Sequence, residues 1–227
     1  MKKKDYNADK YDKPSVTVDM IIFTVKDDDF NVLLVKRNIP PFENYWALPG
    51  GFVRIEESLD EAAKRELSEE TGVKDVYLEQ LYTFGNPKRD PRTRVITVAY
   101  FALINSKDLE LKASTDVSDV KWSSVYKMPE LAFDHKTIIE YAVKRLRWKM
   151  EYTTVGFKLL PKKFTLSQLQ NIYEIIFNKK FDKRNFRKKI LSLGLIEPTK
   201  EKTMNVSHRP AELYSFKRKI GEIIEIL

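Results

Sequence analysis

Hydrophobic residues in the first half of the chain follow the period of β-strands. Residues 16–25 form an apolar, β-branched run that predicts a central strand, and residues 31–36 predict the return strand of a hairpin. The aspartates at 27–29 are interpreted as the turn between them rather than as metal ligands, because aspartate is common at loop tips. Three further strands are expected at 77–85, 95–104 and 120–122.

Two segments of the same part repeat their apolar residues at helical spacing instead. One helix is expected to begin near Ser58 and to end at Gly72, a residue type that ends helices. Residues 129–150 predict a second, long amphipathic helix. Mixed short strands with few helices favour an α+β sandwich. The side chains expected on the buried side of the second helix are Ile138, Ile139, Ala142, Leu146 and Met150.

The last third of the chain has another order of elements. Thr165 and Gln168 have the spacing of a capping box before an apolar helix, and Asp182 caps a basic helix that ends at Gly194. Two short strands follow. Helix, turn, basic helix and β-ribbon is the order of a winged helix-turn-helix. The expected organisation is a flexible arm at 1–14, an α+β domain at 15–150 and a winged helix-turn-helix domain at 151–227.

Composition limits the function classes. The 227 residues are 42% hydrophobic, yet no apolar run approaches the roughly 20 residues of a membrane span. The polar, lysine-rich start lacks the apolar segment of a signal peptide, so a cytoplasmic protein without membrane contact is expected. There are no cysteines and two histidines, which exclude thiolate sites and leave oxygen atoms as the metal ligands.

The net charge of +8 is unevenly distributed. Residues 1–149 hold 25 of the 41 basic and 25 of the 33 acidic residues, so residues 150–227 carry the whole excess. A basic second domain favours a polyanionic partner such as DNA, although a lysine-rich solvated surface or a dimerisation module has the same composition. The side chains expected to contact DNA are Arg184, Asn185, Arg187 and Lys188 on the basic helix and His208 and Arg209 in the loop of the ribbon.

Glutamates cluster on one side of the helix that ends at Gly72. Glu66 is spaced i, i+3 from Glu69 and i, i+4 from Glu70, so three carboxylates are expected to converge within one turn. Like charges repel, but a divalent cation such as Mg²⁺ or Mn²⁺ reverses that effect by binding clustered oxygen ligands. Glu57 lies close enough in the chain to join them, and Arg65 could fix the rotamer of one carboxylate. An ordinary acidic, solvated helix is the alternative.

Two candidate ligand-binding features flank this helix. The loop at 86–94 concentrates Arg89, Arg92 and Arg94, whose guanidinium groups suit a diphosphate but could equally solvate a hairpin tip. Trp46 precedes the glycines of the loop and is either a core anchor or a platform for a base.

The stretch from Gly51 to Val73 resembles the Nudix box, a pattern that combines glycines, an arginine and glutamates at fixed spacing. The resemblance implies a Nudix α/β/α sandwich with a mixed sheet, a bound Mg²⁺ or Mn²⁺ ion and the hydrolysis of a nucleoside diphosphate. The matching positions are Gly51, Glu57, Arg65, Glu66, Leu67, Glu69, Glu70, Gly72 and Val73.

Together with the predicted winged helix, this motif resembles the Nudix-related transcriptional regulators. The family resemblance extends through segments such as NPKRDPRTR, LAFDHKTII and RPAELYSF. It implies a homodimer that binds double-stranded operator DNA and senses ADP-ribose or a related nucleotide. Many such regulators have degraded boxes, whereas this sequence keeps every acidic position, which favours hydrolysis as well as sensing. A housekeeping pyrophosphatase with a basic C-terminal dimerisation module is the competing hypothesis.

The resemblance also assigns roles within the expected site. Glu66, Glu69 and Glu70 would hold the metal, with Glu57 and the carbonyl of Gly50 nearby. The general base is left open between the glutamates of the helix and a loop aspartate. The residues expected to be catalytic are Arg65, Glu66 and Glu70, with Asp116 and Asp119 as alternative bases, and those expected to bind substrate are Trp46, Arg89, Arg92 and Arg94.

Overall fold

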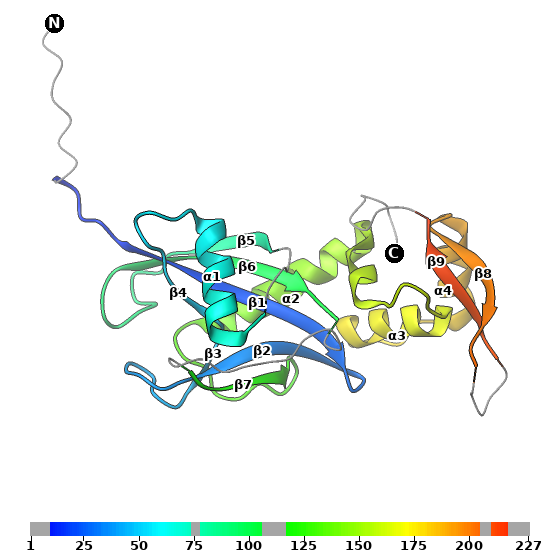
Figure 1. Cartoon of the computed structure of the whole chain (residues 1–227), viewed down its shortest axis with the longest axis horizontal. Coiled ribbons are helices and arrows are strands. Elements are labelled where there is room, and N and C mark those ends of the chain that lie inside the picture. The colour runs from blue at the N-terminus through cyan, green and yellow to red at the C-terminus, as the bar shows by residue number, and fades with distance from the viewer. Residues whose placement is uncertain (1–9, 74–77, 106–116, 205–209, 218–227) are drawn as a thin grey trace, which may run out of the picture.

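A mixed β-sheet with a helix on each face is followed by a smaller helical module that ends in a two-stranded ribbon (Figure 1). This computed structural model describes residues 10–73, 78–105, 117–204 and 210–217. The first module contains β1 (Ser15–Lys26), β2 (Asp29–Arg37), β3 (Trp46–Ala47), β4 (Gly50–Phe52), α1 (Leu59–Thr71), β5 (Glu79–Phe84), β6 (Val95–Leu103), β7 (Val117–Ser124) and α2 (His135–Tyr152). The second contains η3 (Thr154–Leu159), α3 (Leu166–Phe177), α4 (Lys183–Ser192), β8 (Ile196–Lys202) and β9 (Glu212–Phe216).

The predicted hairpin of β1 and β2 is confirmed. Lys26 pairs with Asp29, so Asp27 and Asp28 form a two-residue turn with φ of 52° and 54°. Turns with both central residues at positive φ match the twist of antiparallel strands, and aspartate tolerates that conformation better than most residues. The acidic run is therefore a turn, as the sequence predicts.

The strand order is β3-β2-β1-β6-β5, with β4 added to β1 and β7 added to β2. β1 and β6 are parallel, and the other pairs are antiparallel. One edge of β1 pairs first with β4, over residues 17–19, and then with β2, over residues 23–26. The end of β2 and the start of β4 therefore diverge from the same strand, and a cavity lies at this divergence.

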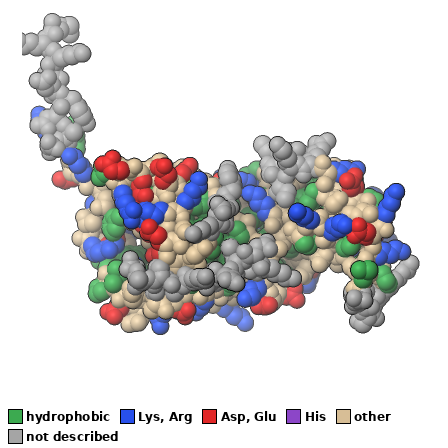
Figure 2. All heavy atoms as spheres, viewed as in Figure 1, with side chains coloured by type: hydrophobic (Ala, Val, Ile, Leu, Met, Phe, Trp, Pro, Cys, Tyr) green, Lys and Arg blue, Asp and Glu red, His purple; other side chains and the backbone are tan. Residues whose placement is uncertain are grey.

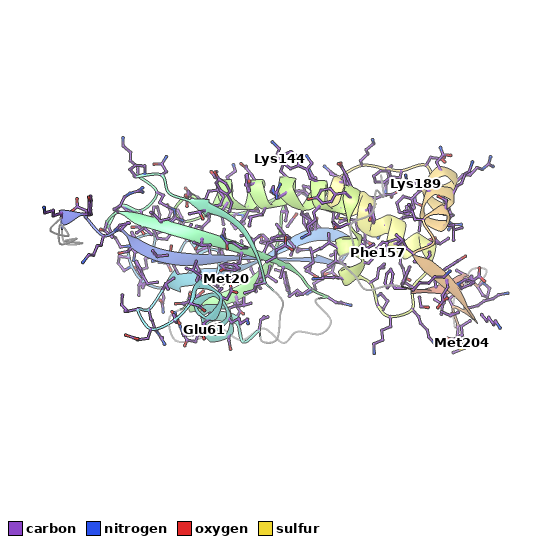
Figure 3. The ribbon with its side chains drawn as sticks, turned by 90° about the horizontal axis from the view of Figure 1, so that it is seen from above. Met20, Glu61, Lys144, Phe157, Lys189 and Met204 are labelled. Atoms are coloured by element: carbon purple, nitrogen blue, oxygen red, sulfur yellow. The ribbon has the colours of Figure 1, made fainter. Side chains whose placement is uncertain are left out.

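Strand β1 has apolar side chains on both faces because each face is covered by a helix. Ile21 and Phe23 lie in the apolar cluster that includes α2, whereas Met20 and Ile22 lie in the cluster that includes α1. Figure 3 shows the sheet between the two helices, with Met20 on the α1 side and Lys144 on the outer surface of α2. The expected α+β sandwich is confirmed.

Helix α2 begins at His135, six residues later than the sequence predicts. Leu131 bridges Trp46 of β3, and Phe133 has a φ of 52°, a conformation that cannot continue a helix. All five side chains expected to be buried on α2 are fully buried. The prediction of the packed face is thus confirmed, and the error is confined to the start of the helix.

The second module is a winged helix. Thr165 and Gln168 form the predicted capping box of α3, Asn178 ends α3 in the left-handed conformation, and Asp182 caps α4. Ile196 pairs with Phe216 to set the register of the β8–β9 ribbon. A bridge between Phe164 and Tyr214, not expected from the sequence, adds a third short segment to the ribbon. No helix in the described part of the chain has the length and apolar character needed to cross a membrane.

The two modules share one apolar core. Only Thr153 separates α2 from η3, and Tyr173 of α3 belongs to the same buried cluster as Phe23 of β1. Figure 3 places Phe157 at this junction. Two side chains of the first module also cap the last carbonyls of α3, since the Tyr126 hydroxyl donates to Ile175 O at 2.6 Å and Arg147 Nε donates to Ile176 O at 2.8 Å.

Candidate functional site

Local sequence sets the position of α1, the helix that carries the glutamates. Ser58 and Glu61 form a reciprocal capping box, and Gly72 ends the helix with a φ of 74°. Ala63 and Leu67 are buried against the sheet. With these side chains fixed, the other side of the helix directs Arg65, Glu66, Glu69 and Glu70 to the cavity beside β4.

The cavity has a volume of about 430 Å³, within the range of small-molecule sites. Its walls come from β1, the end of β2, the glycine loop with β4, α1, the loop before β6 and the residues around the start of α2. Figure 2 shows acidic and basic side chains interleaved over α1, and basic side chains around the outer end of the winged helix. The lining residues are Thr17, Asp19, Val35, Arg37, Ile39, Ala47, Leu48, Gly50, Gly51, Phe52, Arg54, Arg65, Glu66, Glu69, Glu70, Arg89, Asp90, Arg92, Phe133 and His135.

Arg65 donates hydrogen bonds to the carboxylates of three glutamates, Glu57, Glu66 and Glu69. Its Nε and Nη2 donate to the two oxygens of Glu57 at 2.8 and 2.5 Å, and its Nη1 donates to Glu66 at 2.7 Å and to Glu69 at 3.2 Å. These charge-assisted bonds lower the pKa of Glu57 to about 2, chiefly through Arg65 and then through the N–H of Arg54. The expectation that Arg65 fixes a carboxylate holds for Glu57.

Glu70 has a different environment. Its Oε2 accepts the N–H of Gly50 at 2.8 Å, so the carboxylate is turned toward the glycine loop. Burial raises the pKa of Glu70 to about 8, and repulsion by Glu66 and Asp19 adds to the rise, although the bond from Gly50 opposes it. Several carboxylates thus repel each other inside one partly enclosed cavity.

The three glutamates do not converge on one point, which corrects the expectation from their spacing. Within the described residues, no group of three or more acidic, histidine or cysteine side chains is arranged to hold a metal ion. Arg65 draws Glu66 and Glu69 toward itself while Glu70 bonds Gly50 on another side.

The donor set nevertheless suits a divalent cation. Hard carboxylate oxygens that repel each other are the ligands that Mg²⁺ and Mn²⁺ prefer. Gly51 leaves room for one of them, because a Cβ at Gly51 would lie 2.3 Å from Oε1 of Glu66. The residues that could hold the ion are Glu57, Glu66, Glu69 and Glu70, with Gly50 beside them.

Arg89 lines the cavity but is already engaged. Its guanidinium donates to Asp134 at 2.8 Å and to Asp19 at 3.2 Å, and its side chain is buried. His135 also supports this wall, because its Nδ1 accepts the N–H of Leu48 at 2.9 Å, and burial lowers the pKa of the imidazole. Arg89 therefore braces β1 against the start of α2, and the prediction that it grips a ligand has no support from these contacts.

The other predicted substrate residues are placed differently. Arg92 lines the cavity with its side chain 38% exposed, paired with Asp90 at 2.7 Å. Arg94 lies outside the cavity lining and donates to Gly85 O at 2.8 Å. Trp46 is also outside, since it packs at the edge of the main core with Lys121 over its ring at 3.8 Å. The structure brings only Arg92 of these three to the cavity.

The sequence did not point to several residues that line the cavity, among them Arg37, Asp19 and Phe133. Arg37 ends a strand that the sequence predicts, and a charged residue at a strand end beside the glycine loop is the one signal available. Asp119, an alternative base, accepts the N–H of Val120 and is outside the lining. Asp116 lies outside the described residues.

The predicted DNA-binding residues of α4 lie on its surface. Arg184, Asn185 and Lys188 are exposed, whereas Arg187 is half-buried and donates to Ser167 Oγ of α3 at 3.0 Å. Phe186 and Ile190 pack the opposite side of α4 into the core. His208 and Arg209 lie outside the described residues.

A sheet sandwiched by helices, with glycines leading into a glutamate-bearing helix, defines a Nudix domain, and the module after it is a winged helix. Comparison with known families agrees, because residues 13–142 match the NUDIX domain and residues 156–216 match the NrtR DNA-binding winged helix domain. The chain belongs to the Nudix family, and within it to the regulators that carry the NrtR winged helix.

Three relatives illustrate the similarity. The ADPR responsive transcriptional repressor NtrR of Acinetobacter baylyi is 42% identical over 215 residues, which cover 93% of this chain and 85% of the relative. The crystal structure of Shewanella oneidensis NrtR complexed with a 27mer DNA has a TM-score of 0.76 at 40% identity and covers 89% of this chain and 93% of that one. An ADP-ribose pyrophosphatase of Methanocaldococcus jannaschii is 38% identical over 66% of this chain and 83% of its own length.

Proposed function

We propose that this chain is a transcriptional regulator that binds operator DNA through its winged helix, senses ADP-ribose in the Nudix cavity and hydrolyses it with Mg²⁺. One observation carries the proposal. A cavity rich in carboxylates and arginines and a basic winged helix occur in one chain and share one apolar core. The names of the similar proteins, a repressor responsive to ADPR and an ADP-ribose pyrophosphatase, support this ligand.

The DNA-binding part rests on the exposed side of α4. In winged helices the second helix of the helix-turn-helix enters the major groove and the ribbon contacts phosphates. Arg184, Asn185 and Lys188 are free to face base edges and phosphates. Residues 150–227 carry the whole positive excess of the chain, as a polyanion-binding module requires. We infer that the protein binds as a homodimer, so that two copies of α4 read two half-sites.

The enzymatic part rests on the α1 glutamates. Nudix hydrolases use divalent cations, and a bound Mg²⁺ would supply stabilisation of negative charge on the diphosphate. Within the chain itself, Arg65 holds Glu57 in place, and the hydrogen bond from Gly50 fixes the carboxylate of Glu70 at the glycine loop, where it could accept a proton from water. Arg92, an exposed arginine of the loop before β6 that lines the cavity, would orient the ligand.

The test measures both activities on one protein. Fluorescence anisotropy with DNA from the protein's own gene neighbourhood is expected to show sequence-dependent binding that ADP-ribose weakens and salt screens. Incubation with ADP-ribose and Mg²⁺ is expected to release AMP and ribose 5-phosphate. Hydrolysis with only weak binding, indifferent to sequence, would favour the alternative, a housekeeping pyrophosphatase with a basic dimerisation module.

Arg184→Ala is expected to weaken operator binding by about 10-fold, because it removes an exposed charge that would contact DNA. Hydrolysis of ADP-ribose should be unchanged, since α4 does not line the cavity. Arg187→Ala should also reduce affinity, but with a loss of thermal stability, because Arg187 ties α4 to Ser167 of α3. Lys144→Ala, an exposed change on α2, is the control. Equal affinity of wild type and Arg184→Ala would remove Arg184 from the recognition surface.

A further inference from the structure

His135, the first residue of α2, holds the backbone that leads into the glycine loop. Its Nδ1 accepts the N–H of Leu48 at 2.9 Å, and only 4% of the residue is exposed. Because Nδ1 is the acceptor, the ring is the neutral tautomer with its proton on Nε2. Burial also lowers the pKa of the imidazole, which favours this neutral form. The N–H of Leu48 therefore depends on a nitrogen lone pair of His135.

The residues between β3 and β4 are anchored one after another. Next to Leu48, the carbonyl of Pro49 accepts the N–H of Met20 at 2.8 Å. The N–H of Gly50 then donates to Oε2 of Glu70 at 2.8 Å. Leu48 and Pro49 lie between the two strands, so these single hydrogen bonds fix the backbone there. A shift at Leu48 would pass through two peptide units to the N–H that orients Glu70.

A buried network of charged side chains surrounds His135. Its Nε2 is 3.6 Å from Oδ1 of Asp19, whose other oxygen accepts a hydrogen bond from Arg89 at 3.2 Å. Arg89 also bonds Asp134, the residue before His135, through two nitrogens at 2.8 and 3.1 Å. The side chains of Asp19, Arg89 and His135 are at most 8% exposed. The position of the acceptor for Leu48 is thus set by β1, the loop before β6 and the start of α2.

We propose that His135 is a positioning residue for hydrolysis, because it holds the glycine loop close to the point where Gly50 meets Glu70. This inference rests on the proposed function, since it names a residue on which that reaction depends. The hydrogen bond from Gly50 keeps the carboxylate of Glu70 at the loop, so its direction depends on the backbone that His135 holds. A displacement of the reacting groups by about 1 Å can lower a rate by about 100-fold. His135 acts through Leu48 and transfers no proton itself.

Two substitutions at this one position separate the acceptor from the rest of the ring. In His135→Asn the side-chain oxygen can take the place of Nδ1 and accept the N–H of Leu48. His135→Leu is also uncharged and of similar size, but it leaves that buried N–H without an acceptor. With ADP-ribose and Mg²⁺, we expect kcat to fall by about 10- to 100-fold in His135→Leu and by no more than about threefold in His135→Asn. We expect KM to change by less than about threefold in both variants.

Two further measurements on the full chain do not depend on turnover. Hydrogen exchange at the amide of Leu48, followed by NMR, should be about 10- to 100-fold faster in His135→Leu than in wild type or His135→Asn. Titration with Mn²⁺ alone, followed by electron paramagnetic resonance, should show binding weakened by about 10- to 100-fold in His135→Leu. The reason is that Glu70 and Gly50 belong to the residues that could hold the ion, and the loop orients both.

A matched control lowers stability on the same helix, far from the glycine loop. Leu146 is fully buried about three turns further along α2, so Leu146→Val should lower the melting temperature by loosening the core. We expect this variant to hydrolyse ADP-ribose, to bind Mn²⁺ and to exchange the amide of Leu48 as wild type does, at temperatures below its melting transition. A loss that followed from reduced stability alone would appear in Leu146→Val as well as in His135→Leu.

The outcomes separate this inference from the proposed function. Hydrolysis by His135→Leu at the wild-type rate, or an equal loss in His135→Leu and His135→Asn, would overturn the positioning role and leave the function standing. A loss shared with Leu146→Val would overturn it too. A wild type that does not hydrolyse ADP-ribose would reject the proposed reaction. Amide exchange and Mn²⁺ affinity would then decide the role of His135: a defect in His135→Leu that His135→Asn restores supports it, and no defect overturns it.

Discussion

Glu70→Gln is expected to reduce Mg²⁺-dependent hydrolysis of ADP-ribose by about 10²- to 10⁴-fold, while the protein stays folded and bound to its operator. Glutamine has nearly the same shape, and its side-chain oxygen can still accept the N–H of Gly50, now 2.8 Å from Glu70. It carries no charge and cannot accept a proton. The substitution thus removes the chemistry of the carboxylate and keeps the contact that shapes the glycine loop.

The control for Glu70→Gln is Glu56→Gln, an exposed glutamate in the loop before α1 that does not line the cavity. Release of AMP, a thermal melt and DNA anisotropy are measured for both variants. Hydrolysis by Glu70→Gln at the wild-type rate would reject the assignment of Glu70. Loss of hydrolysis together with a lowered melting temperature would indicate damage to the fold instead, and the unchanged DNA affinity that we expect distinguishes the two.

Gly50→Ala is expected to lower the free energy of unfolding by about 1–3 kcal/mol or more, because the added Cβ has no space. It would lie 2.2 Å from the carbonyl oxygen of Val18 and 2.8 Å from Oδ1 of Asp19. The first of these is backbone of the central strand, paired to β4 at this point, and it cannot move without breaking the sheet.

Two other glycines make the comparison specific. Gly85→Ala should change stability by no more than about 0.5 kcal/mol, since its nearest neighbours would be 3.8 Å away. Gly51→Ala should spare stability more than Gly50→Ala does but lose hydrolysis, because its Cβ would displace only the carboxylate of Glu66. Urea unfolding curves measure the first quantity and release of AMP the second. Equal stability of Gly50→Ala and Gly85→Ala would contradict the close approach of Gly50 to the carbonyl oxygen of Val18.

Local signals made α1 predictable from the sequence. The capping box at Ser58, the left-handed stop at Gly72 and the apolar spacing between them act within the helix itself, so no distant contact had to be known. The same holds for the turn at Asp27 and Asp28 and for the caps of α3 and α4. The ends of elements that are set by such local contacts can be predicted from the sequence almost to the residue.

The interior of the cavity depends on distant parts of the chain and was not predictable. Asp19, Arg37 and Phe133 come from β1, β2 and the approach to α2, and only the pairing of the strands brings them together. The spacing of the glutamates indicated their side of the helix but not their rotamers, which Arg65 and the N–H of Gly50 determine. The ion pair of Arg89 was not predictable for the same reason, since its partner Asp134 lies 45 residues away.

The junction between the modules has a consequence for the kind of DNA site such a protein accepts. One residue, Thr153, connects α2 to η3, and buried side chains from both modules pack together around Tyr173. In a dimer of this chain, the distance and orientation between the two α4 helices would then be set by the packing of the modules and not by a flexible linker. Half-sites must therefore keep their phase on the duplex, where one turn is about 10–10.5 base pairs, and an insertion of half a turn would put the second site on the wrong side of the helix.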